Sequence, residues 1–261
     1  MEWECECSWA SDRSYGHVNC CYLKSGRAAS FGHLDCLIKI RQKGKTWDWD
    51  TTIHAVRRGD VTILRYLHEN GALWDRRTCE EAAKLGKLEC LKYAHENGCR
   101  WNGNTTDVAA AAGHVDCLKY ARENGCRWYS TVYEHAFRNH HMNCIKYAFE
   151  NNCPIDTVKP AVMAAAWMEG LEYAFNVMKC RPSLEVCFRA AQCNLQCLKY
   201  AREKGCSWDA TVTLAAAASS ANNCFHYALE EKCPFDYDEC YKMAKSKNNL
   251  KLLAMLKRTL E

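Results

Sequence analysis

The chain has 261 residues, of which 48% are hydrophobic and 25% are charged, and its formal net charge at pH 7 is +4. These values are typical of a globular protein and argue against a disordered chain or a strongly basic nucleic-acid-binding protein. No apolar run approaches the roughly 18 residues of a membrane helix, and the acidic start MEWECECSWASDR is unlike a signal peptide. We therefore expect an intracellular protein of a reducing compartment, the cytoplasm or the nucleus, with no membrane segment.

Residues 1–19 precede the regular part of the sequence and are predicted to cap it. Four cysteines lie in or next to this segment: Cys5, Cys7, Cys20 and Cys21. Together with His17 they could bind zinc, although CxC followed by CC lacks the spacing of paired CxxC motifs. The alternative is an apolar cap that covers the first repeat, because a stack of repeats needs a lid; it would consist of Trp3, Cys7, Trp9 and Val18.

From residue 20 onward the sequence repeats with a period of 27 residues. Nine units begin at Cys20, Trp47, Trp74, Trp101, Trp128, Ile155, Pro182, Trp208 and Phe235. All have 27 residues except the unit that starts at Pro182, which has 26. A fixed period of this length is typical of stacked repeat architectures. We expect the last unit, 235–261, to act as the C-terminal cap.

Each unit carries the pattern of two short helices joined by a tight turn. In the unit 74–100, the small pair Ala82 and Ala83 marks a close helix approach, and Gly86 suits the turn. The following segment LECLKYAHEN has an apolar face of period 3.6 and ends at Gly98, a helix C-cap. At the equivalent place Asn152 is the one substitute that also tolerates the left-handed conformation. Helices this short are marginal alone, so the units must stack.

The repeat resembles the ankyrin repeat. The residues that carry the resemblance are Thr78, Cys79, Ala82, Ala83, Gly86, Leu88, Glu89, Cys90, Leu91, Lys92, Tyr93, Gly98, Cys99, Trp101 and Asn102. The string CLKYAHENGC is most similar to the short, Cys- and Trp-rich ankyrin-like repeats of giant DNA viruses and protists. The resemblance covers residues 20–261 and implies an all-α solenoid of stacked ankyrin-like helix-turn-helix repeats. Because a typical ankyrin unit has about 33 residues, we expect the hairpin finger between units to be shorter here.

Fifteen of the twenty cysteines occupy three positions of the repeat. They are Cys36, Cys90, Cys117, Cys144, Cys197 and Cys224 in the second helix, Cys99, Cys126, Cys153, Cys180, Cys206 and Cys233 after its C-cap, and Cys79, Cys187 and Cys240 in the first helix. Other units place Ile63, Ala72 and Gly170 at these positions, and none of these residues can bind a metal. We therefore predict buried, reduced thiols that act as small hydrophobes.

A basic series also follows the second helices: Arg65, Lys92, Lys119, Lys146 and Lys199. Acidic neighbours such as Glu89, Asp116 and Glu123 largely cancel its charge. The series is therefore predicted to be a solvated face rather than a nucleic-acid-binding ridge.

The sixth and seventh units depart from the pattern. The sixth places Trp167 and Met168 near the turn, Gly170 at a cysteine position and Lys179 at the C-cap, while the seventh is one residue short. Two explanations remain open. Either Trp167, Met168 and Phe188 form an exposed apolar patch for a partner, or the repeat has decayed and these side chains repack into the core.

No catalytic constellation, phosphate-binding loop or HExxH motif occurs in the sequence, so we expect neither an enzyme nor a cofactor. The ankyrin resemblance implies a monomeric scaffold that binds a partner protein on the concave surface of the first helices. Because arginine and aromatic residues dominate interface energetics, the predicted partner-binding residues are Arg57, Arg58, Arg138, Trp167, Met168, Phe188 and Arg189. The alternatives are a structural component, for example of a virion, that acts through its flanks and ends, and a zinc-binding or redox role of the Cys-rich N-terminus.

Overall fold

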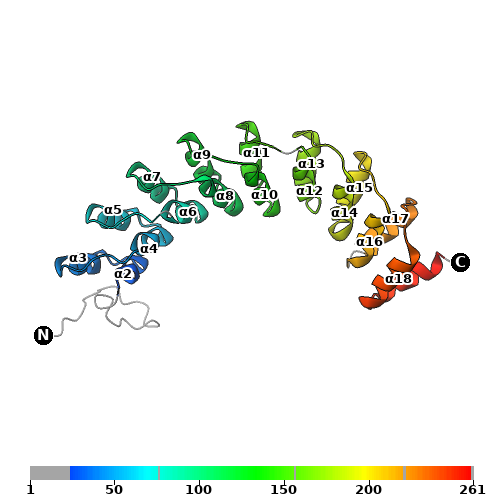
Figure 1. The fold of residues 1–261 in the computed structure, drawn as a ribbon, viewed down its shortest axis with the longest axis horizontal. Coiled ribbons are helices and arrows are strands. Elements are labelled where there is room, and N and C mark those ends of the chain that lie inside the picture. Colours follow the sequence, from blue (N-terminus) through cyan, green and yellow to red (C-terminus); the bar gives the residue numbers. More distant parts are fainter. Residues whose placement is uncertain (1–23, 76, 156, 220–221, 260–261) are drawn as a thin grey trace. The chain divides into compact units, whose positions relative to one another are not determined.

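The computed structural model describes residues 24–75, 77–155, 157–219 and 222–259. The predicted N-terminal cap and the zinc candidates Cys5, Cys7, Cys20 and Cys21 lie outside the described residues. The described residues form eighteen α-helices and no strand (Figure 1).

The helices, in chain order, are α2 (Ser25–Phe31), α3 (Leu34–Gln42), α4 (Thr51–Arg58), α5 (Val61–Glu69), α6 (Arg77–Lys84), α7 (Leu88–Glu96), α8 (Gly103–Ala112), α9 (Val115–Glu123), α10 (Thr131–Arg138), α11 (Met142–Glu150), α12 (Lys159–Ala164), α13 (Met168–Asn176), α14 (Leu184–Cys193), α15 (Leu195–Glu203), α16 (Ala210–Ala218), α17 (Asn222–Glu230), α18 (Tyr237–Ser246) and α19 (Leu250–Arg258).

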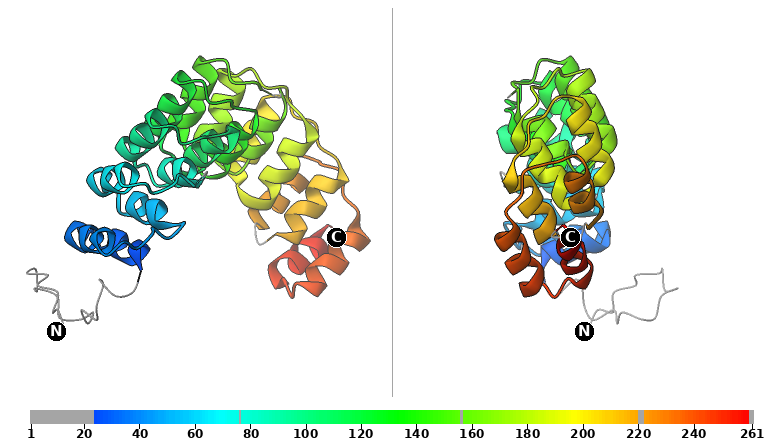
Figure 2. Two further views of the ribbon diagram at one scale, coloured as in Figure 1. Left: turned by 60° about the vertical axis from the view of Figure 1, so that its left-hand side comes forward. Right: turned by 90° about the vertical axis from the view of Figure 1, so that its right-hand side faces the viewer.

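These helices form one pair for each predicted repeat, and the predicted fold class, an all-α solenoid of helix-turn-helix repeats, is confirmed. The chain divides into two compact parts, which we call the N-terminal half, Met1–Val132, and the C-terminal half, Tyr133–Glu261, with the boundary inside α10. In the N-terminal half α2, α4, α6 and α8 pack on one another in turn, and α5, α7 and α9 do the same. In the C-terminal half α12, α14, α16 and α18 form one layer, and α13, α15, α17 and α19 form the other. Figures 1 and 2 show the two layers in each half.

Small side chains allow the first helices to approach closely. Ala82 and Ala83 in α6 and Ala190 and Ala191 in α14 are completely buried. The larger side chains of the core come from the second helices, as Leu91, Leu118 and Leu198 show. The core of each unit is therefore a narrow layer between the two rows of helices, as expected for repeats that bury one another's faces.

The burial of the fifteen repeat cysteines is confirmed: each of them is buried, whereas Cys193 is exposed. Several thiols after the second helix also donate hydrogen bonds to backbone carbonyls at the start of the same unit. The Cys126 Sγ lies 3.1 Å from the carbonyl oxygen of Asn102, and the Cys233 Sγ lies 3.4 Å from that of Asp209. The thiol thus fills space and tethers the two ends of a unit.

The tryptophan that opens a unit makes a similar connection. The indole N–H of Trp47 donates to the carbonyl of Asn70 at 2.9 Å, and that of Trp74 donates to the carbonyl of Asn97 at 2.8 Å. An imidazole from the preceding second helix stacks on the ring, as His68 does on Trp74 with 4.6 Å between ring centroids. These tryptophans are therefore packed between units.

The second helices end as the glycine pattern predicts. Gly44, Gly71, Gly98, Gly125 and Gly205 all have positive φ, and Asn152 follows them at 57°. However, Asn152 is not the one substitute. Lys179 and Lys232 adopt the same left-handed conformation, each at 55°, in the sixth and eighth units.

The turns between paired helices explain the short seventh unit. Most units place a left-handed residue here, such as Gly59 or Gly113. In the seventh unit Asn194 alone is both the C-cap of α14 and the N-cap of α15, and its side-chain oxygen accepts from the backbone N–H groups of Gln196 and Cys197 at 2.9 and 3.3 Å. One residue performs two capping roles, so the turn needs one residue fewer.

Candidate partner-binding face

The first helices keep one side free of their neighbours, and we call its residues the first-helix face. Each helix contributes the two residues before its packed small pair and the one after it. In α6 these are Glu80, Glu81 and Lys84, which flank the buried Ala82 and Ala83 and are themselves half-buried or exposed. The face is thus a by-product of packing, since the small pair fixes which side of the helix remains outside.

In the N-terminal half, one ion pair on this face joins neighbouring helices. The predicted site residue Arg57 in α4 is exposed, and its Nε lies 2.7 Å from the Glu81 carboxylate in α6. The other predicted residue, Arg58, lies at the turn, where its guanidinium occupies the space beside Gly32 and its Nε is 3.9 Å from the Asp60 carboxylate. The structure thus separates the two arginines, since Arg57 is on the first-helix face and Arg58 is at the turn.

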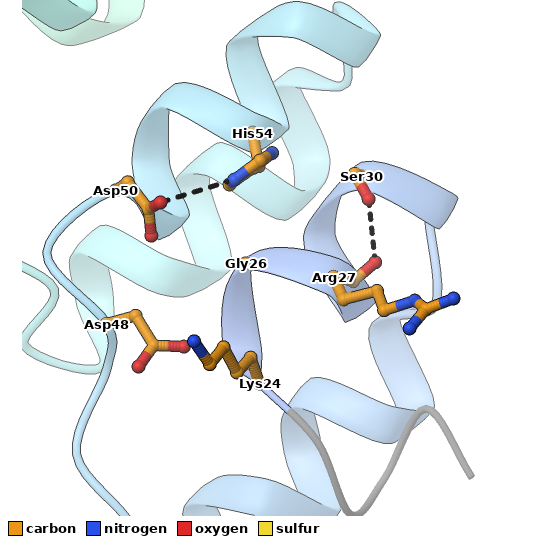
Figure 3. A pocket seen from close by; sticks show the side chains of 7 residues that line it. All are labelled: Lys24, Gly26, Arg27, Ser30, Asp48, Asp50 and His54. Carbon is orange, nitrogen blue, oxygen red and sulfur yellow. Dashed lines mark hydrogen bonds and ion pairs between the residues drawn. The ribbon is translucent and has the colours of Figure 1, made fainter. Parts of the chain in front are cut away.

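A cavity of about 330 Å³ opens between α2 and α4 (Figure 3). Gly26 lies close to the His54 ring, since an added Cβ there would be 2.8 Å from it. His54 faces Asp50 at 3.4 Å, and Asp48 accepts a hydrogen bond from Ser25 at 2.9 Å. With Lys24 and Arg27 also lining it, the cavity mixes both signs of charge.

In the C-terminal half the predicted partner-binding residues fall into two groups. Arg138, Phe188 and Arg189 lie on the first-helix face, Arg138 and Arg189 exposed and Phe188 half-buried. The Nε of Arg189 lies 3.0 Å from the Glu185 carboxylate one helical turn earlier. Trp167 and Met168 instead belong to the turn between α12 and α13, where Trp167 is the N-cap and Met168 the first helical residue.

Trp167 is packed into that turn. Its ring stacks on His140 with 4.7 Å between centroids and 19° between planes, and it meets Phe137 edge-on at 6.5 Å. Gly170 lies against the ring, since a Cβ at this position would overlap the indole. The glycine that replaces the usual cysteine therefore makes room for the tryptophan. Trp167, Met168 and Phe188 are each half-buried, with Trp167 and Met168 at the turn and Phe188 on the first-helix face.

The sixth unit also shifts its first-helix register. In α12 the buried residues are Pro160, Ala161 and Ala164, followed by Ala165 at the C-cap. This pattern places Val162 and Met163 on the first-helix face, one residue later than counting by 27 from Glu80 and Glu81 gives. The signal in the sequence was Pro160, which favours the first turn of a helix and marks where α12 starts.

Two face residues in the last units were missed by the sequence reasoning. Leu214 in α16 and Tyr241 in α18 occupy the position that Phe188 has in α14, and both are half-buried. The ring of Tyr241 stacks on Tyr237 with 6.0 Å between centroids. Alignment of the small pairs, rather than a search for arginine and tryptophan, would have found them.

The buried thiols of the second helices are poor nucleophiles. Burial raises the pKa of Cys90, Cys117, Cys197 and Cys224 to about 11, from an ordinary value of 9.0. Within the described ranges, no group of three or more His, Cys, Asp or Glu side chains is arranged to hold a metal ion. In the same part of the chain, no helix combines the length and apolar composition needed to cross a bilayer.

No protein-family model matches the chain, and no curated protein matches it. Among solved structures, the chain is similar to the crystal structure of the human ASB11 ankyrin repeat domain. The two are 20% identical with a TM-score of 0.41, over 69% of this chain and 82% of that chain.

Proposed function

We propose that this protein is a non-enzymatic scaffold that binds a partner protein on its first-helix face. The observation that carries the proposal is a contrast between the two layers of helices. Second helices repeat the same residues, as in the series Lys92, Lys119, Lys146 and Lys199, whereas the first-helix face changes its chemistry from unit to unit. A face free to vary on a constant framework is what a specific binding surface requires.

The framework also suits binding physically. Short packed helices hold the face residues in place, so little conformational entropy is lost when a partner docks. Arg57, Arg138, Phe188 and Arg189 are our candidates for the main contacts on the face, with Arg58, Trp167 and Met168 at its turn-side edge. Arginine and aromatic side chains provide most of the energy in interfaces of this kind.

A pull-down from the native cell tests the proposal. The tagged wild-type chain is compared with a face variant, Arg57→Glu with Arg138→Glu and Arg189→Glu. The matched control changes three exposed second-helix cations, Arg65→Glu, Lys119→Glu and Lys146→Glu. We expect a protein that the wild type and the control retain and the face variant loses, with melting temperatures unchanged. Equal capture by the face variant, or loss only in the control, would contradict the proposal.

A further inference from the structure

We propose that the first-helix face of the C-terminal half docks an acidic, extended protein segment that carries an apolar residue at every third position. This inference rests on the proposed function and specifies the partner's chemistry. Its core is four side chains that we call the apolar row: Val162 in α12, Phe188 in α14, Leu214 in α16 and Tyr241 in α18.

The four residues lie in line because the packing places them there. Val162, Phe188 and Leu214 each lie two residues before the packed small pair of their own helix. Tyr241 occupies the equivalent position in α18. The helices that carry them pack successively, α12 on α14, α14 on α16 and α16 on α18. All four side chains are half-buried, so each has an accessible part that faces away from the core.

Packing alone does not require apolar residues at this position. In α6, α8 and α10 it is occupied by Glu80, Asp107 and Glu134, which are also half-buried. The same helical framework therefore accepts a carboxylate here. A run of four apolar side chains in successive helices is a feature of the surface rather than of the core, and partly exposed apolar rows mark interaction sites.

The charges beside the apolar row indicate the charge of the partner. The twelve face residues of α12, α14, α16 and α18 include three cations, Arg189, Lys242 and Lys245, and no carboxylate. The only salt bridge of these three within the described residues joins Arg189 to Glu185, and both of its side chains are more than half exposed. Lys242 and Lys245 are exposed on α18. Acidic side chains between the partner's apolar residues would complement this charge.

The spacing of the helices sets the spacing of the partner's anchors. Packed helices have axes about 8–10 Å apart. A polyproline-type segment rises about 3.1 Å per residue with three residues per turn, so every third side chain points the same way at intervals of about 9 Å. A β-strand repeats its face at about 6.7 Å and would lose register with the row. An extended segment that crosses the helices therefore meets one apolar row residue with every third side chain.

The test uses the full chain and a fluorescently labelled peptide of repeated Leu-Glu-Pro triplets. Its matched controls are repeated Leu-Lys-Pro triplets and a helix-forming acidic peptide with leucine at every seventh residue. We expect saturable binding of the first peptide, measured by fluorescence anisotropy, weakened by added salt. The lysine peptide should bind at least about tenfold more weakly.

Two variants assign the binding to the row. Phe188→Ser with Leu214→Ser should weaken the Leu-Glu-Pro peptide about tenfold or more, and the exposed pair Lys242→Glu with Lys245→Glu should do the same without risk to the fold. Val108→Ser, on the first-helix face of α8 in the N-terminal half, is the matched control and should leave binding unchanged. Melting temperatures establish that each variant is folded.

Three outcomes would overturn the inference: no saturable binding of the acidic peptide, equal binding of the lysine peptide, or tighter binding of the helical one. The proposed function fails separately. If the native partner is lost from the Arg57, Arg138 and Arg189 variant but retained by the Lys242 and Lys245 variant, binding on the first-helix face stands and the acidic-segment assignment falls.

Discussion

The contact between Trp167 and Gly170 shows how one irregular residue in a repeat requires another. The indole packs on His140 in the preceding turn and on Phe137 in α10, and its ring occupies the space that a Cβ at position 170 would need. A glycine inside α13 lowers intrinsic helix stability by up to about 1 kcal/mol relative to alanine. The two residues form a packed pair, in which the contacts of the ring offset the weaker helix.

This pairing predicts that the effect of Gly170→Cys on stability depends on whether Trp167 is present. Restoring the repeat cysteine with Gly170→Cys should destabilise the protein by about 1–3 kcal/mol, because the new side chain overlaps the ring. In a Trp167→Ala background the same change should be neutral or slightly stabilising, since only helix propensity remains. Urea unfolding of the four chains of this double-mutant cycle measures the coupling. Equal effects of Gly170→Cys in both backgrounds would show that the ring does not occupy this space.

The buried thiols lead to a labelling prediction. At neutral pH a thiol reagent should modify Cys193 quickly, whereas Cys90, Cys117 and Cys224 should react only when the chain unfolds. The thiolate is the reactive form, and burial both shields these sulfurs and raises their pKa to about 11. Mass spectrometry of digested, briefly labelled protein locates the modified residues. Rapid modification of the three buried cysteines in the folded chain would contradict their packing.

The same pKa shifts predict a loss of stability at alkaline pH. In the unfolded chain these thiols ionise near their ordinary value of 9.0, but in the folded chain only near 11. Deprotonation therefore favours the unfolded state, and the free energy of unfolding should fall as the pH rises from about 9 towards 11. A Cys90→Ala, Cys117→Ala variant should show a smaller fall over this range in urea titrations. An identical pH dependence in both chains would count against the buried thiols as its source.

At the scale of the helix, a left-handed residue follows every second helix except α19 and decides where the helix stops. Gly98 and Gly125 have φ of 86° and 83°, and an added Cβ at either would meet no atom within 4 Å. Any effect of a side chain there is therefore conformational. Lys179 and Lys232 hold the same conformation at 55° with a Cβ present, at an energetic cost that glycine avoids.

Reciprocal substitutions test this. Gly98→Ala should destabilise the protein by about 1 kcal/mol, while Lys179→Gly should stabilise it by a smaller amount, because the unfolded chain also gains freedom. Lys204→Gly is the control for loss of a lysine, since Lys204 caps α15 with negative φ. Thermal unfolding compares the variants. A stability gain from Lys204→Gly equal to that from Lys179→Gly would remove the conformational explanation.

The elements also show what the sequence could and could not predict. The repeat period, the small pairs and the glycines locate each helix pair, because all three follow from local packing and backbone conformation. The register of α12 could not be obtained by counting, because its buried residues lie one position later than the 27-residue period gives. The first-helix face therefore contains Val162 and Met163, which only the burial pattern reveals. Likewise the row through Leu214 and Tyr241 depends on which helices pack together.

At the scale of the whole molecule, units that contact only their neighbours should lose stability from the ends. Deleting residues 235–261 removes α18 and α19, which pack on α16 and α17. The uncovered faces should lower the melting temperature by about 5 °C or more and promote aggregation, and deleting residues 208–261 should not restore solubility. Light scattering and thermal unfolding measure both effects. A chain ending at Pro234 that is as soluble and stable as the parent would contradict the capping role of the last unit.

The most direct test of the first-helix face as the binding surface is site-specific photo-crosslinking in the native cell. A photoreactive phenylalanine analogue is placed singly at Arg57, Arg138 or Arg189 on the first helices, and at Arg65, Lys119 or Lys146 on the second helices, all exposed positions. We predict a common crosslinked protein from first-helix positions and none from second-helix positions. Crosslinks to the same protein from the second helices, with none from the first, would contradict the account.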